Sequence, residues 1–237
     1  MVEEHNDTSP EHCQVATMKL QEPSSAELEL QVESVGAAAV DQQELIIQRA
    51  DELCLSEIEI ENLLKARGSL RVVLGNDSQR TALFSGGVNL KQIFVARQAG
   101  QLVGYLLVQL GDSSPFQANW RDFRRIHGRS ASWRYLAYRF LEWRGARYPA
   151  YIYSLKVDLF SRGKGIAAHL LRKIEDFLSA EDVSSITLEV RADNRAALRL
   201  YLRCGYEIIG FHSSNGMAAL IGFGNVVRMQ KILIHEA

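Results

Sequence analysis

The stretch that decides the fold runs from residue 151 to residue 178 and reads YIYSLKVDLFSRGKGIAAHLLRKIEDFL. Its first eight residues, 151–158, have the composition of a β-strand. Apolar residues then recur at helical spacing over residues 166–178, which is typical of an amphipathic helix. Between the two lie Gly163 and Gly165, so the stretch predicts a strand, a glycine-containing turn and a helix in that order.

The turn is a candidate anion site because it lies at the start of the predicted helix. Backbone N–H groups without helical partners and the positive end of the helix dipole point outward at such a position. Gly163 and Gly165 lack a β-carbon, so the main chain there can approach phosphate oxygens closely. Two glycines before a helix also fit an ordinary structural turn, so the motif is informative only together with its context.

Further elements are predicted on the N-terminal side of this stretch. Apolar and polar residues alternate over residues 27–35, as they do in a half-buried strand. One capping box predicts a helix over residues 41–54, and a second predicts a helix that begins after Ser56. Two β-rich runs, 92–98 and 101–110, predict a hairpin. The pattern between the second helix and the hairpin favours no assignment.

The C-terminal side continues the alternation of strands and helices. A strand is predicted over residues 184–190, a helix over 195–203, and two more strands over 206–211 and 225–234. This order of elements predicts an α/β fold with a mixed central β-sheet that is flanked by helices on both faces.

Composition limits the class of protein. The 237 residues are 47% hydrophobic and 23% charged, which is enough for a substantial core. A formal net charge of -1 excludes the global field of a typical nucleic-acid binder. Three cysteines are too few for a disulfide framework, and no Cys or His pair has zinc-ligand spacing, so no metal is expected.

The N-terminal region predicts a separate role. Residues 1–24 carry five acidic residues and show no apolar period, which predicts a flexible acidic leader before a domain over residues 25–237. The start of the chain lacks the features of a signal peptide, and no window has the roughly 18 to 20 apolar residues of a membrane span. A cytoplasmic location is therefore expected.

A second motif lies about thirty residues after the glycines. Residues 188–207 read LEVRADNRAALRLYLRCGYE, which predicts a strand, a turn with Asn194 and a short helix carrying Tyr201. Together the two motifs resemble the GNAT superfamily of acyl-CoA-dependent N-acetyltransferases. The first is similar to the family's Arg/Gln-x-x-Gly-x-Gly/Ala pyrophosphate loop, and the second to its Asn-x-x-Ala-x-x-x-Tyr-x-x-x-Gly-Tyr/Phe segment. Residues 194–206 especially resemble the ribosomal-protein alanine N-acetyltransferases.

The resemblance implies acetyl-CoA as co-substrate and names the residues that would hold it. Backbone groups of Leu155 and Val157 would bind the pantetheine arm as if it were an added strand, and Asn194 would also bind the arm. The pyrophosphate would be held by the loop residues Arg162, Gly163, Lys164, Gly165, Ile166 and Ala167. Leu159 stands where many members have Pro, and Ala167 stands where Gly is commoner. Neither departure blocks recognition by the backbone.

The resemblance also implies a catalytic pair. Acetyl transfer needs an uncharged amine and a proton for the departing thiolate. Glu189 is the candidate base because it turns to the opposite face of its strand from Leu188 and Val190. Tyr201 is the candidate acid. The alternatives are a solvated strand carboxylate and a core aromatic residue, and Cys204 fits a packed thiol better than an acyl carrier.

Two classes of function remain open at this point. The favoured one is direct transfer of acetyl to a primary amine in a ternary complex, with a small molecule or a peptide as acceptor. The other is a non-catalytic acyl-CoA-binding regulatory or interaction module of the same fold. Thiol release from acetyl-CoA in the presence of amines would separate the two.

Residues 113–149 exceed what a minimal member of this family needs and predict a helical insertion. Residues 120–148 contain eight arginines against two acidic residues, a formal charge of +6. An apolar stripe recurs there at helical spacing, formed by Trp133, Leu136, Ala137, Phe140 and Leu141. The stripe either packs on the domain beside solvated arginines or forms an acidic-substrate groove, an oligomer contact, or a nucleic-acid or membrane surface. Among the functional readings, substrate recognition is favoured, and nucleic acid is disfavoured.

Overall fold

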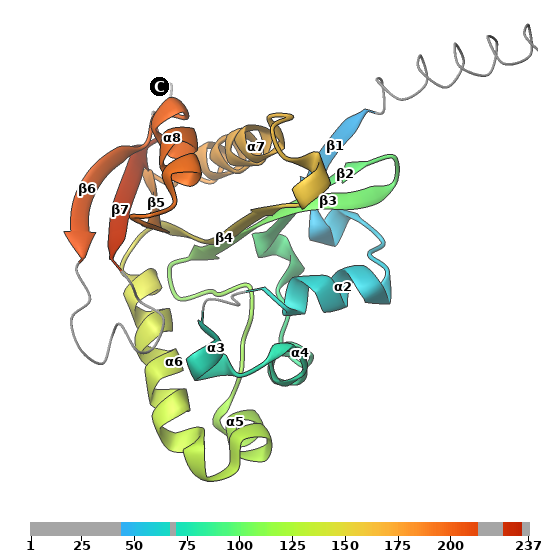
Figure 1. Ribbon diagram of the computed structural model, residues 1–237, viewed down its shortest axis with the longest axis vertical. Coiled ribbons are helices and arrows are strands. Elements are labelled where there is room, and N and C mark those ends of the chain that lie inside the picture. The colour runs from blue at the N-terminus through green and yellow to red at the C-terminus, as the bar shows by residue number, and fades with distance from the viewer. Residues whose placement is uncertain (1–43, 67–69, 213–224, 234–237) are drawn as a thin grey trace, which may run out of the picture. The chain divides into compact units, whose positions relative to one another are not determined.

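The computed structural model describes residues 44–66, 70–212 and 225–233. Within these residues, which belong to the unit Glu44–Ala237, seven strands form one sheet in the order β1-β2-β3-β4-β5-β7-β6 (Figure 1). The strands are β1 (Leu45–Arg49), β2 (Ile93–Gln98), β3 (Gln101–Leu110), β4 (Ala150–Val157), β5 (Ser185–Arg191), β6 (Glu207–His212) and β7 (Val226–Ile232). The predicted leader over residues 1–24 and the predicted strand over residues 27–35 lie outside the described residues.

The sheet is mixed, as predicted. Strands β1 to β4 are antiparallel neighbours, and β7 lies antiparallel to both β5 and β6. Only β4 and β5 run parallel among the described strands. A parallel pair needs a crossover connection, and here the crossover contains helix α7 (Ile166–Ala180).

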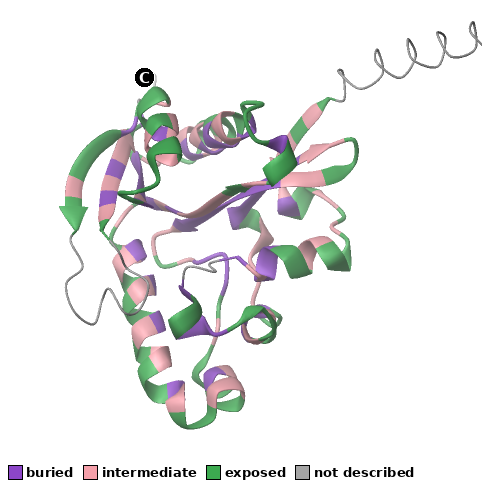
Figure 2. Cartoon of the chain, viewed as in Figure 1, coloured by how far each residue is buried: buried purple, intermediate pink, exposed green. Residues whose placement is uncertain are grey.

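Helices cover both faces of the sheet, with α7 and α8 on one side and the others on the opposite side (Figure 1). Residues along β2 alternate between the two cores, because Phe94 and Ala96 face α7 whereas Ile93 and Val95 face the opposite layer. Figure 2 shows the resulting buried residues along the central strands. The α-helices not yet given are α2 (Glu57–Leu64), α3 (Arg71–Leu74), α4 (Asp77–Phe84), α5 (Trp120–His127), α6 (Ala131–Ala146) and α8 (Arg195–Arg203).

The helix predicted over residues 41–54 is wrong. Leu45–Arg49 form the edge strand β1, and a short 3-10 turn follows at Ala50–Glu52. The apolar positions fit either period, and pairing with β2 together with the packing of Leu45 and Ile47 against the α7 core selects the strand. Tertiary contacts thus override the local helical pattern.

The second capping box is confirmed and is tied to the sheet. The Ser56 hydroxyl accepts from the Glu59 N–H at 3.3 Å, and the Glu59 carboxylate accepts from the Ser56 N–H at 2.8 Å. Glu59 also binds the Arg97 guanidinium of β2 at 2.7 Å. The unassigned region that follows contains α3 and α4, and α4 begins with another capping box between Asn76 and Gln79.

Residues 113–149, the predicted helical insertion, contain α5, a 3-10 turn at Gly128–Ser130 and α6. Helix α6 lies close to the sheet at Gly145, where a β-carbon would collide with the Gln109 amide group. The Tyr138 hydroxyl lies 3.2 Å from the Phe116 carbonyl and donates to it. Within the described part of the chain, no helix combines the length and apolar character needed to cross a membrane.

The alternative in which the apolar stripe of α6 packs on the domain holds for only two of its five residues. Ala137 and Leu141 pack against the core, but Trp133, Leu136 and Phe140 are 44%, 72% and 55% exposed. The helix is rotated so that Ala131, Tyr138, Glu142 and Gly145 form its buried face. Small residues and a hydrogen-bonded tyrosine permit this closer packing.

Candidate active site

The central feature of the site is a separation of two neighbouring strands. Residues 150–152 of β4 pair with residues 186–188 of β5, and the pairing then stops. Beyond this point β4 continues along β3, whereas β5 continues along β7. The two strands therefore diverge and leave an opening in the middle of the sheet.

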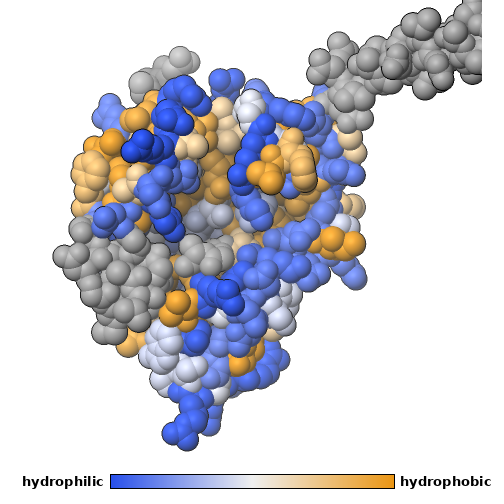
Figure 3. Space-filling model, viewed as in Figure 1, coloured by the Kyte–Doolittle hydropathy of each residue, from blue (hydrophilic) through white to orange (hydrophobic). Residues whose placement is uncertain are grey.

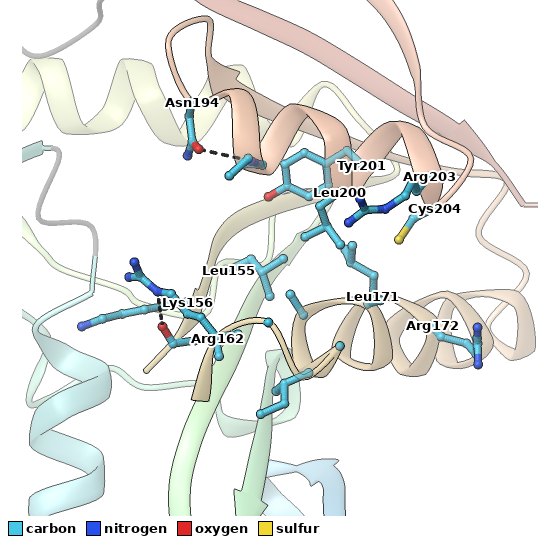
Figure 4. A pocket seen from close by; sticks show the side chains of 18 of the residues that line it. Leu155, Lys156, Arg162, Leu171, Arg172, Asn194, Leu200, Tyr201, Arg203 and Cys204 are labelled. Carbon is cyan, nitrogen blue, oxygen red and sulfur yellow. Dashed lines mark hydrogen bonds between the residues drawn. The ribbon is translucent and has the colours of Figure 1, made fainter. Parts of the chain in front are cut away.

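A cavity of about 750 Å³ lies at this opening. It is lined by the end of β4, the glycine loop, the first turns of α7 and one side of α8. Figure 3 shows the hollow between α8 and the connection from β4 to α7, with apolar surface on its floor. In the close view, Leu200 and Tyr201 lie across from Leu155 (Figure 4).

The edge of β4 presents backbone groups to the cavity. The Asp158 N–H donates to the Val103 carbonyl of β3 at 2.8 Å, so Asp158 faces β3. Successive residues of a strand direct their backbone groups to opposite edges, which turns those of Val157 and Leu155 toward the cavity. The Val157 carbonyl accepts from Arg162 Nε at 3.3 Å, in agreement with this direction.

The glycine loop forms the second wall. Gly163 and Gly165 have left-handed φ values of 81° and 78°, which only glycine adopts without strain. Helix α7 starts without a side-chain cap, and its first backbone bond runs from the His169 N–H to the Gly165 carbonyl. The N–H groups of the first turn therefore lack helical acceptors beside the cavity. Of the six predicted loop residues, all except Lys164 line the cavity.

Substitution of Gly165 by valine is expected to weaken acetyl-CoA binding by about 10- to 100-fold. A β-branched residue at a φ of 78° is strained by at least about 1–2 kcal/mol, so the loop would have to rearrange. Gly100→Val is the matched control, because Gly100 has a φ of 74°, lies in the β2–β3 turn and has open space around its Cβ position. Calorimetric titration should show reduced affinity for Gly165→Val alone, and equal losses in the two variants would contradict the assignment.

Two residues of α8 complete the cavity. Asn194 caps the helix, since its Oδ1 accepts from the Ala197 N–H at 3.2 Å (Figure 4). The Tyr201 side chain is buried, and its ring contacts Tyr206 edge to face at 5.8 Å. Burial raises the pKa of Tyr201 to about 12. The residue therefore keeps its proton at neutral pH and can serve as a donor.

The raised pKa of Tyr201 predicts a loss of stability in alkali. The model-compound pKa is 10.0 and the folded pKa is about 12, so between these values the folded state binds more protons than the unfolded state. The contribution of Tyr201 to stability is thus fully present below pH 10 and falls as pH rises, by up to about 3 kcal/mol for two pKa units. Urea unfolding at pH 8, 10 and 11 should show this decline, and Tyr201→Phe should make it shallower. An unchanged slope in the variant would contradict the burial effect.

Glu189 lies outside the cavity, on the face of β5 that points toward α6. Its neighbours in β5 pack in the α7 core, which confirms the predicted alternation. Glu189 Oε1 binds Arg144 of α6 and Arg228 of β7, each at 2.8 Å. The Tyr151 hydroxyl lies 3.4 Å from Oε2. The structure therefore places the two candidate catalytic residues on opposite sides of the opening.

Sequence reasoning missed the partners of Glu189 and the basic end of the cavity. Arg228 lies directly opposite Glu189 in the β5–β7 register, and no local pattern announces that pairing. The side chains of Arg172, Arg203 and Lys231 also line the cavity. Lys231 binds the Glu175 carboxylate of α7 at 2.7 Å. The three cations that line the cavity come from α7, α8 and β7, so only the fold brings them together.

Comparisons with known proteins agree with this geometry. The chain is 29% identical over 116 residues to the N-alpha-acetyltransferase RimI of Mycobacterium tuberculosis. The aligned region covers 48% of this chain and 51% of that protein. It is 38% identical over 61 residues to the mycothiol acetyltransferase of Brachybacterium faecium, covering 26% of this chain and 18% of that one. The chain thus spans about half or less of the length of the curated relatives it matches.

A structural comparison supports the fold, and a family model supports the relationship. The crystal structure of SsHAT superposes with a TM-score of 0.51 at 17% identity, covering 81% of this chain and 99% of that chain. The model of the acetyltransferase (GNAT) family matches residues 76–206, which is more than half of the chain. That match includes the glycine loop, Glu189 and Tyr201. The chain belongs to the acetyltransferase (GNAT) family.

Proposed function

We propose that this protein transfers the acetyl group of acetyl-CoA to a primary amine by direct attack in a ternary complex. The observation that carries the proposal is the opening between β4 and β5, which ends at the uncapped start of α7. The open backbone edge of β4 matches an amide-containing arm, and the first-turn N–H groups match a pyrophosphate. The basic side chains at the cavity suit the negative charge of such a molecule.

Tyr201 is proposed to act on the leaving group. When bound, acetyl-CoA supplies an activated thioester. A thiol has an ordinary pKa of about 8.5, well below the value of about 12 for Tyr201. Complete proton transfer from the tyrosine is therefore uphill, by roughly 5 kcal/mol for 3.5 pKa units. We assign to its hydroxyl a hydrogen bond that strengthens as negative charge develops on the sulfur.

Glu189 is proposed to accept the proton of the amine, directly or through water. Its Oε1 is fixed by Arg144 and Arg228, so Oε2 is the oxygen we assign to this role. Placement on the face away from Tyr201 suits a ternary complex in which amine and thioester approach from opposite sides of the opening. In this arrangement the two arginines position the carboxylate.

A peptide α-amine is the acceptor we favour. A lysine amine with a pKa of about 10.4 is neutral in only roughly one molecule in 2,500 at pH 7, but an α-amine near 8 is neutral in roughly one in ten. The similarity to an N-alpha-acetyltransferase points in the same direction. A positioned carboxylate then has to shift the amine equilibrium by only about one pKa unit.

The second candidate function is an acyl-CoA-binding module without turnover. It is favoured by one observation, the engagement of Glu189 in two ion pairs. In that case the carboxylate would fasten α6 to the sheet and play no part in proton transfer.

Thiol release from acetyl-CoA tests the proposal. The acceptors would be an alanine-initiated peptide, Nα-acetyl-lysine, spermidine and free alanine, each assayed beside direct binding of CoA. Turnover with the peptide is expected. Binding of CoA without turnover of any of the four amines would support the second candidate. Absence of both CoA binding and turnover would contradict both candidate functions.

A further inference from the structure

The geometry points to a docking surface for an acidic polypeptide on the outward side of α6. We call it the α6 face; its residues are Trp133, Leu136, Arg139, Phe140, Trp143 and Arg147. The inference rests on the proposed function and narrows its acceptor to a protein segment. In the proposed arrangement the acceptor presents its N-terminal amine at Glu189 and lays an acidic, apolar stretch along α6.

Large apolar side chains are exposed along the outward side of α6. Trp133, Leu136, Phe140 and Trp143 are 44%, 72%, 55% and 56% exposed. Their spacing of three, four and three residues places them on one side of the helix. Figure 2 shows exposed residues recurring along α6. A contiguous exposed apolar patch of this kind marks an interaction site more often than scattered surface residues do.

The aromatic rings of the patch contact one another, and arginines lie against them. The rings of Phe140 and Trp143 lie 5.8 Å apart. The Arg147 guanidinium lies 5.2 Å from the centroid of Trp143, and the Arg134 guanidinium lies 4.9 Å from that of Trp133. These contacts present flat apolar surfaces beside positive charge, a combination that suits mixed acidic and apolar partners.

Charge decides between the possible occupants. Residues 120–148 carry a formal charge of +6, and of their two acidic residues Glu142 is buried while Asp122 binds Arg125 at 3.1 Å. A second copy of the same face would bring arginines against arginines, which disfavours self-pairing. An anionic partner with its own apolar side chains is complementary in both respects.

Continuity with the candidate active site decides the role of that partner. Arg144 follows Trp143 directly and holds Glu189 at 2.8 Å. From Trp133 to Trp143 the helix rises by about 15 Å, at about 1.5 Å per residue. An extended segment of four or five residues covers this length at about 3.3 Å per residue. A polypeptide on the α6 face therefore leads toward the carboxylate that we assign as base.

Three synthetic peptides with the same free N-terminal alanine test the inference. The first has twelve residues, with Glu and Leu alternating after position 4; the second has Lys in place of each Glu; the third stops at position 4. The test variant is Leu136→Ser with Phe140→Ser. The control is Ile58→Ser, which removes a 71% exposed apolar residue from α2. Arg134 is left intact because it binds the Val72 carbonyl at 2.6 Å and supports α3.

Two readouts are needed, and the first is independent of turnover. Fluorescence anisotropy of the labelled acidic peptide, with CoA present, should show binding that weakens about 10- to 100-fold in the test variant and not in the control. The kcat/KM for the acidic peptide should fall by a similar factor, with the four-residue peptide unaffected. If the wild-type protein binds the acidic peptide but does not acetylate it, the proposed function is contradicted while the docking surface is retained.

Other results would overturn the inference. These are equal binding of the acidic and Lys-containing peptides, an equal effect of the test variant on the long and short peptides, or no binding of the acidic peptide at all. Variant-sensitive binding of phosphatidylserine vesicles or of a 20-nucleotide DNA in place of the peptide would assign the α6 face to a membrane or to nucleic acid instead.

Discussion

Replacing Tyr201 with phenylalanine is expected to lower kcat by about 10²- to 10³-fold, the usual effect of removing one hydrogen-bond donor from charge that develops in the transition state. The phenyl ring keeps the edge-to-face contact with Tyr206 and fills the same volume, so the fold should be retained. Only the hydroxyl is lost. The measurement is thiol release from acetyl-CoA under saturating amine, with the melting temperature recorded for both proteins.

The constant that changes in Tyr201→Phe identifies the role of the hydroxyl. Because Tyr201 is assigned to the departing thiolate, kcat and kcat/KM should fall together while the dissociation constant for CoA changes little. Tyr206→Phe serves as a matched control, since Tyr206 is buried behind Tyr201 and does not line the cavity. If both variants retain full kcat, neither hydroxyl stabilises the departing thiolate and another group must do so.

Replacing Glu189 with glutamine is expected to reduce both stability and activity. The Glu189 side chain is only 10% exposed and faces Arg144 and Arg228, which a neutral amide leaves without a counter-charge. Breaking a largely buried ion pair costs about 3–5 kcal/mol, and the lower end applies here because both guanidiniums reach solvent. Activity should fall by about 100-fold at pH 7 if the carboxylate also acts as base.

The pH dependence separates these two effects. A base is needed less as the amine becomes neutral by itself, so the ratio of wild-type to Glu189→Gln rates should shrink between pH 7 and pH 9. A purely structural carboxylate gives a ratio that does not change with pH. Assays well below the melting temperature of the variant keep unfolding out of the comparison, and Arg228→Gln reports the effect of losing one ion pair with the carboxylate retained.

Local patterns predicted most of the fold. The helix Arg195–Arg203 begins and ends as expected, and so do the hairpin and the sequence of strand, loop and helix around the glycines. In each case the apolar period and the capping residues lie within one short segment. The helix prediction was wrong for residues 45–54 because their apolar positions fit both the helical and the strand period. Only pairing with the neighbouring strand β2 selects the strand.

Long-range neighbours explain what the sequence did not show of the site. Strand β7 lies between β5 and β6, so Arg228 meets Glu189, which lies 39 positions earlier in the chain. Arg144 reaches the same carboxylate from α6, a region where the sequence alone offered only a count of arginines. The exposed side of α6 could not be predicted for the same reason. A helical period identifies an apolar stripe, but only the neighbouring sheet decides which side of the helix is covered.

Titration calorimetry with acetyl-CoA tests most directly whether the opening between β4 and β5 is the co-substrate site. We expect saturable binding with one site per chain in the wild type and in Gly100→Val, and a marked loss of affinity in Gly165→Val. Absence of heat at high ligand excess, from protein shown to be folded by circular dichroism at more than one temperature, would contradict the assignment of the cavity and with it the proposed activity.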